Sequence, residues 1–408
     1  MEDIMLNVSV LGYGTVGSGV VEVLTTNSES IAKKVGKQLN VKYILDLRDF
    51  PGDPNEDKIV HDFNIIADDD SVDIVVETMG GVKPAYDFVK TCLEAGKSVC
   101  TSNKELVAKH GAELLAIAKE KNVNFFFEAS VGGGIPIIRP INECVTGDVI
   151  VEISGILNGT TNYILSKMTS EGSDFDTVLK DAQDKGYAEK NPEADVEGYD
   201  ACRKIAILTS LAYGKQVDFE DIYTEGITKI TDVDINYAKA LGASIKIFGS
   251  SKMVDGKVFA KVAPVLIDSK HPLYMVNDVF NGIFVKGNMV GDLMFYGSGA
   301  GSLPTASAVV GDVVAAAKNM GRNIPVIWEQ EKLEIADMKE ASQRFFVRLS
   351  GDKAQNEAKV AELFGTVQVV DAGVAQEYAF ITDAVKEGDF AKKAEELGNV
   401  VSRIRVDF

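Results

Sequence analysis

Residues 5–24 read MLNVSVLGYGTVGSGVVEVL and decide how the chain begins to fold. The apolar run at the start predicts a buried β-strand, and VGSGVVEVL at the end predicts a helix. Between them, Gly12, Gly14 and Gly17 form the pattern GxGxxG. Between a first strand and a first helix, these glycines allow a tight turn, close approach of a pyrophosphate to the helix N-terminus, and tight helix–strand packing. The stretch predicts dinucleotide binding, and a glycine turn with a structural role alone is the alternative.

The alternation of strand and helix continues through the first third of the chain. Short β-rich runs (VKYILD, VDIVVET, KSVCTS and VNFFFEA) are separated by helical patterns such as VKPAYDFVKTCLEAG. This order predicts an α/β fold with a doubly wound parallel sheet of the Rossmann type over residues 1–135. The helical pattern at 304–325 carries small apolar residues along one face, so we expect it to complete this domain.

The pattern changes after residue 135. Longer strand-like runs (VIVEISGIL, KVFAKVAPVLI and GIFVKGNMVGDLMFYG) are mixed with helical segments, which predicts an α+β domain over residues 136–303. The polar stretch 329–343 has the composition of a linker. Residues 344–408 then follow the order strand, helix, strand, strand, helix, strand, which is the ferredoxin-like βαββαβ order.

Length and composition exclude several functions. A chain of 408 residues exceeds what one hydrophobic core usually supports, so two or three domains are expected. The net charge of -19 would repel a phosphate backbone, which argues against a nucleic-acid partner. There is no apolar run of roughly 18 residues for a membrane span and no basic region at the N-terminus, so we expect a cytoplasmic protein. Four scattered cysteines and three histidines do not form a zinc motif, and a proton donor of another residue type is expected.

Polar residues follow the predicted strands at the edge where open α/β sheets bind ligands. Asp46 and Arg48 lie two residues apart after the second strand. An acid there binds the ribose of NAD and an arginine accommodates the 2′-phosphate of NADP, so the choice of cofactor stays open. Thr101 and Lys104 follow SVC, and Lys104 could meet cofactor or substrate. Solvated charges at a strand end or a helix start are the alternative.

Two further segments place an acid beside a feature that can serve a ligand: a glycine run in one and a lysine on the same helix face in the other. Glu128 lies near the end of VNFFFEA and precedes a glycine run. Its carboxylate beside unhindered carbonyls suits a hard cation, although a tight turn fits as well. Asp200 and Lys204 are four residues apart and share one face of the helical run DACRKIAILTSLAYG. A surface ion pair is one interpretation. The apolar residues after Lys204 favour a buried helix instead, in which a lysine can act as proton donor.

Together these segments resemble the homoserine dehydrogenase family over about residues 5–325. Besides the glycine loop, the matching segments are TSNKE, EASVGGGIP, GILNGTTNYIL, GYAEKNPEADVEGYDACRK and GSGAGSLPTASAVVGD. The resemblance implies NADP- or NAD-dependent interconversion of L-aspartate 4-semialdehyde and L-homoserine, a step of threonine and methionine biosynthesis. It also implies a homodimer, with residues 136–303 as the substrate-binding and dimerisation domain.

The resemblance assigns roles to individual residues. Lys204 would donate the proton, and Lys104 would stand near the cofactor and the reacting carbon. The substrate would be held by Gly186, Glu189 and Asp200. The dinucleotide would also touch Thr15, Val16 and Gly301. A monovalent cation, usually sodium, would be bound by Glu128 and by the backbone oxygens of Val131, Gly133 and Ile135.

Residues 344–408 resemble an ACT-type regulatory domain, for which threonine would be the expected effector. The first loop reads Leu349-Ser-Gly-Asp-Lys-Ala354 and lacks the Pro-Gly-Val pattern of many ligand-binding members, so a packing module that binds nothing is the alternative. Two other functions are considered. One is a non-catalytic dinucleotide sensor, and the other is an enzyme like aspartate semialdehyde dehydrogenase, for which Cys202 would have to be the nucleophile.

Overall fold

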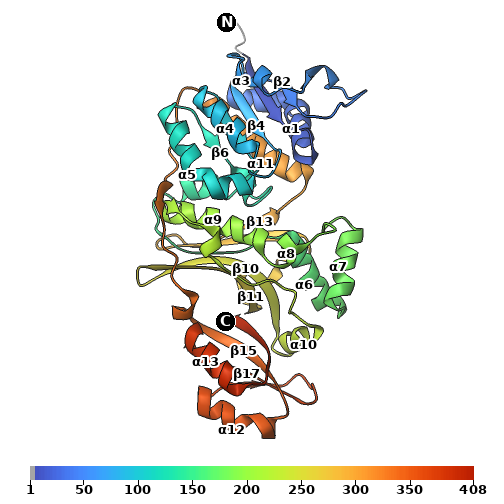
Figure 1. The fold of residues 1–408 in the computed structure, drawn as a ribbon, viewed down its shortest axis with the longest axis vertical. Helices are drawn as coiled ribbons and strands as arrows, with labels where there is room; N and C mark the ends of the chain where they lie inside the picture. Colours follow the sequence, from blue (N-terminus) through green and yellow to red (C-terminus); the bar gives the residue numbers. More distant parts are fainter. Residues whose placement is uncertain (1–4) are drawn as a thin grey trace. The chain divides into compact units, whose positions relative to one another are not determined.

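The computed structural model describes residues 5–408, which form two compact units (Figure 1). Unit 1 runs to Val149 and also contains Ala206–Asp218 and Gly297–Leu333. Unit 2 consists of Ile150–Ile205, Phe219–Tyr296 and Glu334–Phe408. The first residues of the N-terminus, considered above for a leader segment, lie outside the described residues. Within residues 5–408, no helix is long and apolar enough to cross a membrane.

Unit 1 is built on a six-stranded sheet in which every neighbouring pair is parallel. The strand order is β3-β2-β1-β4-β5-β6, which confirms the doubly wound sheet. The order reverses between β1 and β4, and ligands of such folds bind at the carboxyl ends of the strands beside this point. The strands are β1 (Leu6–Leu11), β2 (Leu39–Leu45), β3 (Ile59–Val60), β4 (Ile74–Glu77), β5 (Ser98–Thr101) and β6 (Phe125–Phe126).

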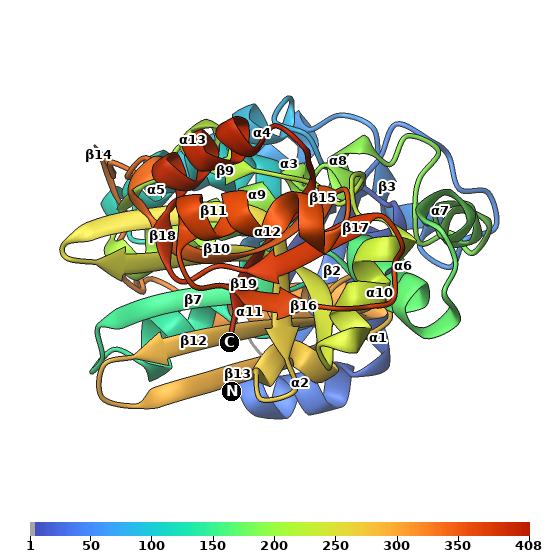
Figure 2. The ribbon, with the colours of Figure 1, turned by 90° about the horizontal axis from the view of Figure 1, so that it is seen from below.

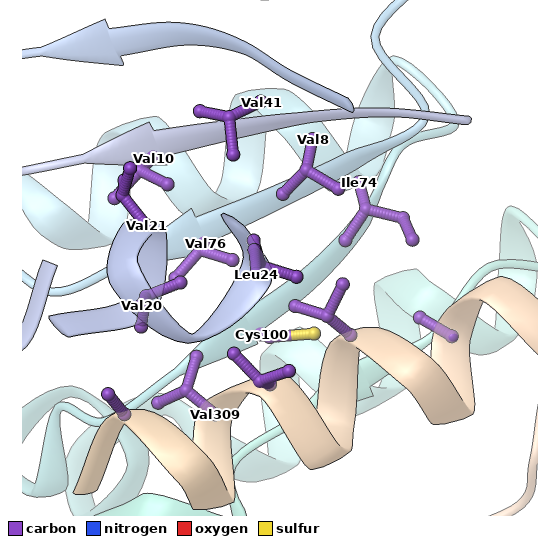
Figure 3. Packing of buried hydrophobic residues seen from close by; sticks show 14 of the residues in the cluster. Val8, Val10, Val20, Val21, Leu24, Val41, Ile74, Val76, Cys100 and Val309 are labelled. Atoms are coloured by element: carbon purple, nitrogen blue, oxygen red, sulfur yellow. The ribbon is translucent and has the colours of Figure 1, made fainter. Parts of the chain in front are cut away.

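One face of this sheet is covered by α1 (Thr15–Thr26) and α11 (Ser302–Lys318). Figure 3 shows the valines of the strands against Val20, Leu24 and Val309 of these helices. Each buried side chain of this size contributes about 1.5–3 kcal/mol. The two helices cross closely at Gly19, where a Cβ atom would lie 3.1 Å from the Cβ atom of Ala306. The remaining helices are α2 (Ser28–Val35), α3 (Asn64–Ala67), α4 (Ala85–Glu94) and α5 (Lys104–Glu120).

Unit 2 contains a mixed sheet in the order β13-β12-β7-β10-β11-β19-β15-β17-β16 (Figure 2). Its centre is the long antiparallel hairpin of β10 (Ala243–Val254) and β11 (Lys257–Asp268). The run at 282–297, expected as one strand, forms two: β12 (Phe280–Gly287) and β13 (Gly291–Ser298). The chain turns before Gly291, whose φ of +78° suits glycine. The other strand of this part is β7 (Ile150–Ile156).

Between β7 and β10 and before the C-terminal segment, the chain forms the helices α6 (Gly159–Glu171), α7 (Phe175–Asp184), α8 (Glu193–Val196), α9 (Tyr199–Tyr213) and α10 (Asp232–Ala240), and the residues of α9 from Ala206 onward belong to unit 1. Asparagine and aspartate side chains begin two of them, since Asn158 accepts from the N–H of Thr161 and Asp174 from that of Thr177. These caps satisfy N–H groups that the helix leaves unpaired. The cap of α6 also places Asn158 at the edge of the candidate substrate site described below.

The C-terminal segment has the predicted βαββαβ order, with both helices over one face of its strands (Figure 2). It is joined to unit 2 and does not form a unit of its own, because β19 pairs in parallel with β11. The expected linker at 329–343 is partly ordered: β14 (Glu329–Lys332) pairs with β8 (Lys215–Gln216). The C-terminal elements are β15 (Ser342–Ser350), α12 (Lys353–Phe364), β16 (Gln368–Val370), β17 (Glu377–Ile381), α13 (Glu387–Leu397) and β19 (Val400–Asp407).

Candidate active site

The glycine loop of unit 1 lies between β1 and α1. Gly12 has φ of +93°, which a residue with a side chain rarely adopts. A Cβ atom on Gly17 would lie 1.9 Å from the carbonyl oxygen of Gly12, so only glycine fits there. The hydroxyl of Thr78, just after β4, donates to the same carbonyl at 3.0 Å. The loop is therefore held tightly, and its shape depends on Gly12 and Gly17.

The start of α1 has the features of a phosphate site. Its N-cap is Gly14, no side chain of the described residues caps it, and nothing lies within 4 Å of a Cβ atom built on Gly14. The space beside Gly14 is therefore open, and the first N–H groups of the helix, around Thr15 and Val16, lie at a positive helix end that favours an anion. The first turn of α11 also lies here, since the Ser302 hydroxyl donates to the Thr15 carbonyl at 2.6 Å. Gly301 precedes that turn with φ of +118°. These features fit a dinucleotide pyrophosphate.

Asp46 and Arg48 bind one another at the end of β2. Arg48 donates from Nε to Asp46 Oδ1 and from Nη2 to Oδ2, each at 2.9 Å. The N–H of Tyr13 in the glycine loop also donates to Asp46 Oδ2, at 2.9 Å. Together, Arg48 and these backbone bonds hold the pKa of Asp46 well below its ordinary value. Asp46 is thus an ionised, nearly buried anchor of the loop, whereas the Arg48 side chain is 63% exposed and can turn toward a ligand.

The ends of β4 and β5 meet around a buried acid that the sequence analysis overlooked. The Thr101 hydroxyl donates to Glu77 Oε2 at 2.6 Å, and the N–H of Met79 donates to Oε1 at 2.7 Å. Complete burial raises the pKa of Glu77. Asn103, whose N–H bonds Thr101, caps the helix α5 that begins at Lys104. Thr101 is thus committed to Glu77, and Lys104 lies half-buried on the first turn of a helix at the ligand edge of the sheet.

In unit 2, Lys204 and Asp200 form the buried pair that their spacing on α9 suggested. Lys204 Nζ lies 2.8 Å from Asp200 Oδ2 and donates to the Leu157 carbonyl, also at 2.8 Å. Lys204 is only 9% exposed and Asp200 only 5%. The Asn158 amide donates to Asp200 Oδ2 at 3.0 Å. The ammonium group is thus held by two oxygens, one from Asp200 and one from the Leu157 carbonyl.

A second carboxylate belongs to this cluster, although the sequence analysis did not single it out. The same Asn158 amide donates to Asp195 Oδ1 at 2.7 Å, so one amide holds two acids. Glu189 is not drawn into this network in the described chain: its side chain is exposed, on the loop between α7 and α8. Gly186 begins that loop with φ of +74°. The structure therefore brings Asp200 and Lys204 together, and leaves Gly186 and Glu189 on a neighbouring loop.

Comparison with known proteins assigns this arrangement to a family. A model described as "Homoserine dehydrogenase" matches residues 136–314, and one described as "Homoserine dehydrogenase, NAD binding domain" matches residues 12–128. A homoserine dehydrogenase of Bacillus subtilis is 44% identical over 320 residues, which are 77% of this chain and 73% of that protein. The chain belongs to the homoserine dehydrogenase family. It is accordingly an oxidoreductase, and unit 1 contains its NAD(P)-binding domain.

Solved structures of homoserine dehydrogenases extend the likeness to the whole chain. The enzyme of Thiobacillus denitrificans matches with a TM-score of 0.90 and 35% identity, over 99% of this chain and 98% of that one. The enzyme of S. aureus matches with a TM-score of 0.83 and 37% identity, over 99% of each chain. The similarity to these homoserine dehydrogenases therefore includes residues 344–408, which the two family models do not cover.

The surroundings of Cys202 exclude the acyl-enzyme alternative. A homoserine dehydrogenase needs no thiol nucleophile, whereas an aspartate semialdehyde dehydrogenase needs a reactive thiolate. Cys202 is buried on α9, and its Sγ donates to the Phe219 carbonyl at 3.2 Å. Burial raises the pKa of this thiol. Cys202 is a core residue.

The Glu128 carboxylate, the one side chain of the predicted cation site, accepts hydrogen bonds from backbone donors. Both oxygens of Glu128 are already occupied: Oε1 accepts from the N–H groups of Ile137 and Ile138 at 2.6 and 2.7 Å. Oε2 accepts from the N–H and Nε of Arg139 at 2.9 and 3.3 Å. The carboxylate thus serves as an anchor for backbone donors. Among residues 5–408, no group of three His, Cys, Asp or Glu side chains could hold a metal ion. The backbone oxygens of Val131, Gly133 and Ile135 remain as predicted ligands.

Proposed function

We propose that the chain interconverts L-aspartate 4-semialdehyde and L-homoserine with Lys204 as the proton donor. The observation that carries this proposal is the buried ammonium group, held by Asp200 and the Leu157 carbonyl at 2.8 Å each. An ammonium with two fixed oxygens has one direction left for donation. A substrate oxygen placed there would receive a short, charge-assisted hydrogen bond.

When bound, the nicotinamide supplies or accepts the hydride, and the protein supplies the proton and the electrostatics. In the reductive direction, negative charge develops on the aldehyde oxygen, and Lys204 stabilises it before donating its proton. In the oxidative direction, the neutral amine takes the hydroxyl proton of homoserine. Asp200 holds the Lys204 side chain in place in both directions.

Substrate recognition requires carboxylates, because homoserine carries an ammonium group. Asp195 and Asp200 are fixed by the Asn158 amide, and Glu189 lies on the exposed loop beside them. We assign Asp200 to the region of the hydroxyl or aldehyde and Glu189 to the amino group, with Gly186 supplying backbone contact. Asp195 shares the Asn158 amide with Asp200 and adds negative charge to the same cluster.

For the cofactor, the start of α1 and Gly301 would hold the pyrophosphate, and Asp46 and Arg48 would meet the adenosine ribose. The Asp46–Arg48 pair leaves both NAD and NADP acceptable. Lys104 would stand near the nicotinamide. A monovalent cation, usually sodium, would be bound beside Glu128 by the backbone oxygens of Val131, Gly133 and Ile135.

The dimer and the threonine effector also stay predictions. The loop at which an effector would bind is closed by its own side chains, since the Asn356 amide donates to the carbonyls of Ser350, Gly351 and Asp352 at 3.0–3.1 Å. This arrangement favours a packing role for residues 344–408.

The test is NAD- and NADP-dependent oxidation of homoserine by the wild type beside Lys204→Met. Loss of a proton donor lowers turnover by about 10²–10⁴-fold. We expect a loss of at least this size in kcat, with dinucleotide binding unchanged. A wild type that binds dinucleotide but does not turn over homoserine would contradict the proposal and favour a sensor. A Lys204→Met variant with wild-type kcat would remove Lys204 from the mechanism.

A further inference from the structure

Two arginines of the C-terminal strands are buried within unit 2. Arg348 lies on β15 and Arg405 on β19, and they are 3% and 1% exposed. A buried guanidinium without partners costs several kcal/mol, so each needs carboxylates with good geometry. Each arginine binds one carboxylate outside the C-terminal segment. These two carboxylates belong to different parts of unit 2.

Arg405 binds Glu225, which precedes α10 in the chain. Its Nε and Nη2 donate to the two oxygens of Glu387 at 2.8 Å each, and its Nη1 donates to Glu225 Oε2 at 2.9 Å. Arg403 and the Tyr223 hydroxyl lie 3.4 and 2.9 Å from the same oxygen. Burial alone would raise the pKa of Glu225, but Arg403 and Arg405 hold it below its ordinary value. Glu225 is therefore a fixed, ionised anchor.

The segment that follows Glu225 packs directly on the end of α8. A Cβ atom on Gly226 would lie 2.2 Å from the Val196 carbonyl oxygen, so the two backbones touch. The N–H of Ile227 donates to that oxygen at 2.8 Å. The Thr228 hydroxyl donates to Glu197 at 3.0 Å. The position of Val196 and Glu197 thus depends on residues 225–228.

Val196 follows Asp195, the acid that shares the Asn158 amide with Asp200. A continuous series of contacts therefore runs from Arg405 through Glu225 and the end of α8 to the carboxylates beside Lys204. Every step is a hydrogen bond, an ion pair or a backbone contact inside unit 2. A change in the angle of α8 would shift Asp195 relative to Asp200, and with it the charge that faces the substrate.

We infer that Arg405 and Glu225 are positioning residues for the protein carboxylates that face the substrate. The C-terminal segment therefore helps to hold the substrate site in shape. The inference rests on the proposed function, because it takes Asp195 and Asp200 as substrate-facing groups. It gives residues 344–408 a role that needs no effector.

Arg348 provides a matched control. It is buried to a similar degree and ties the same segment to the rest of unit 2 through Asp234 at 2.7 Å, while Glu377 of the segment's own β17 binds it at 2.7 and 2.9 Å. Asp234 belongs to the capping box of α10, which contains no residue of the proposed substrate site. Loss of Arg348 should therefore loosen the segment without moving α8.

The experiment compares Arg405→Met, Glu225→Gln and Arg348→Met in the full chain, by homoserine oxidation, homoserine calorimetry in the presence of reduced cofactor, with which homoserine does not react, and thermal unfolding. For Arg405→Met and Glu225→Gln we expect the KM and Kd for homoserine to rise about 3- to 30-fold, with the KM for the dinucleotide unchanged. Arg348→Met should lower Tm and leave the KM for homoserine as in wild type. Arg405→Lys, which keeps a charge beside Glu225, should recover part of the affinity.

Two results would overturn the inference. One is a wild-type KM for homoserine in Glu225→Gln, which is nearly isosteric and remains informative if Arg405→Met does not fold. The other is an equal rise in KM in Arg348→Met and Arg405→Met, which would indicate general loosening. A wild type without homoserine turnover would instead reject the proposed function, so the two failures are distinguishable.

Discussion

Asp200 Oδ2 lies 2.8 Å from Lys204 Nζ, one turn apart on the same face of α9, and both side chains are buried. An exposed pair at this spacing contributes about 0.3–0.5 kcal/mol, which would be a weak reason to keep it. For a buried pair the cost of losing one partner is larger, because the other charge is then left unpaired inside the protein. The pair therefore couples the position of the proton donor to the charge of its neighbour.

This coupling predicts different results for two substitutions. Asp200→Asn keeps the shape but removes the charge that holds the ammonium, so kcat should fall, though by less than in a variant without the proton donor. Lys204→Met should lose at least about 10²–10⁴-fold in kcat. Steady-state kinetics of homoserine oxidation would separate the two variants, and a wild-type kcat with a raised KM for homoserine in Asp200→Asn would show that Asp200 acts on the substrate alone.

Asn158 is predicted to matter through its amide donor. Asn158→Asp retains a good helix cap for α6 but places a third carboxylate against Asp195 and Asp200. We expect a rise in the KM for homoserine of at least about 10-fold, equivalent to one charge-assisted hydrogen bond of ~1.5–3 kcal/mol. Asp174→Asn at the cap of α7 is the control and should leave KM unchanged. Normal homoserine affinity in Asn158→Asp would argue against the shared-amide arrangement.

The sequence predicted the Asp200–Lys204 pair because an i,i+4 spacing is visible in one helix. It could not predict Asn158–Asp195, because those residues are 37 positions apart and meet only through the fold. Nor could it predict the hydrogen bonds of Glu128, whose partners are the N–H groups of Ile137 to Arg139, because backbone donors leave no trace in side-chain patterns. Five strands of the six-stranded sheet were predictable from the rhythm of apolar runs, whereas β3, with only two residues, was not predicted. The pairing of β11 with β19 was not predictable, because each strand belongs to a segment whose own sequence pattern gives no sign of a partner strand in the other.

Arg48 is predicted to set the preference between cofactors. Its guanidinium binds Asp46 and is exposed enough to reach a 2′-phosphate. Arg48→Ala should therefore raise the KM for NADP by about 10-fold or more, the scale of one lost charged contact, and change the KM for NAD little. The readout is the ratio of kcat/KM for the two cofactors. An unchanged ratio would mean that neither Arg48 nor its pairing with Asp46 distinguishes them.

Glu128 is predicted to stabilise unit 1 without binding a cation. In Glu128→Gln, an NH₂ group replaces one acceptor oxygen and meets backbone N–H donors, which leaves buried donors unsatisfied at a cost of about 1–3 kcal/mol each. Thermal unfolding in sodium chloride and in choline chloride should therefore show a lower Tm for the variant by the same amount in both salts. Activity should respond to sodium equally in wild type and variant, because any ion would be held by the backbone oxygens of Val131, Gly133 and Ile135. A sodium response that disappears in Glu128→Gln would restore the carboxylate as a ligand.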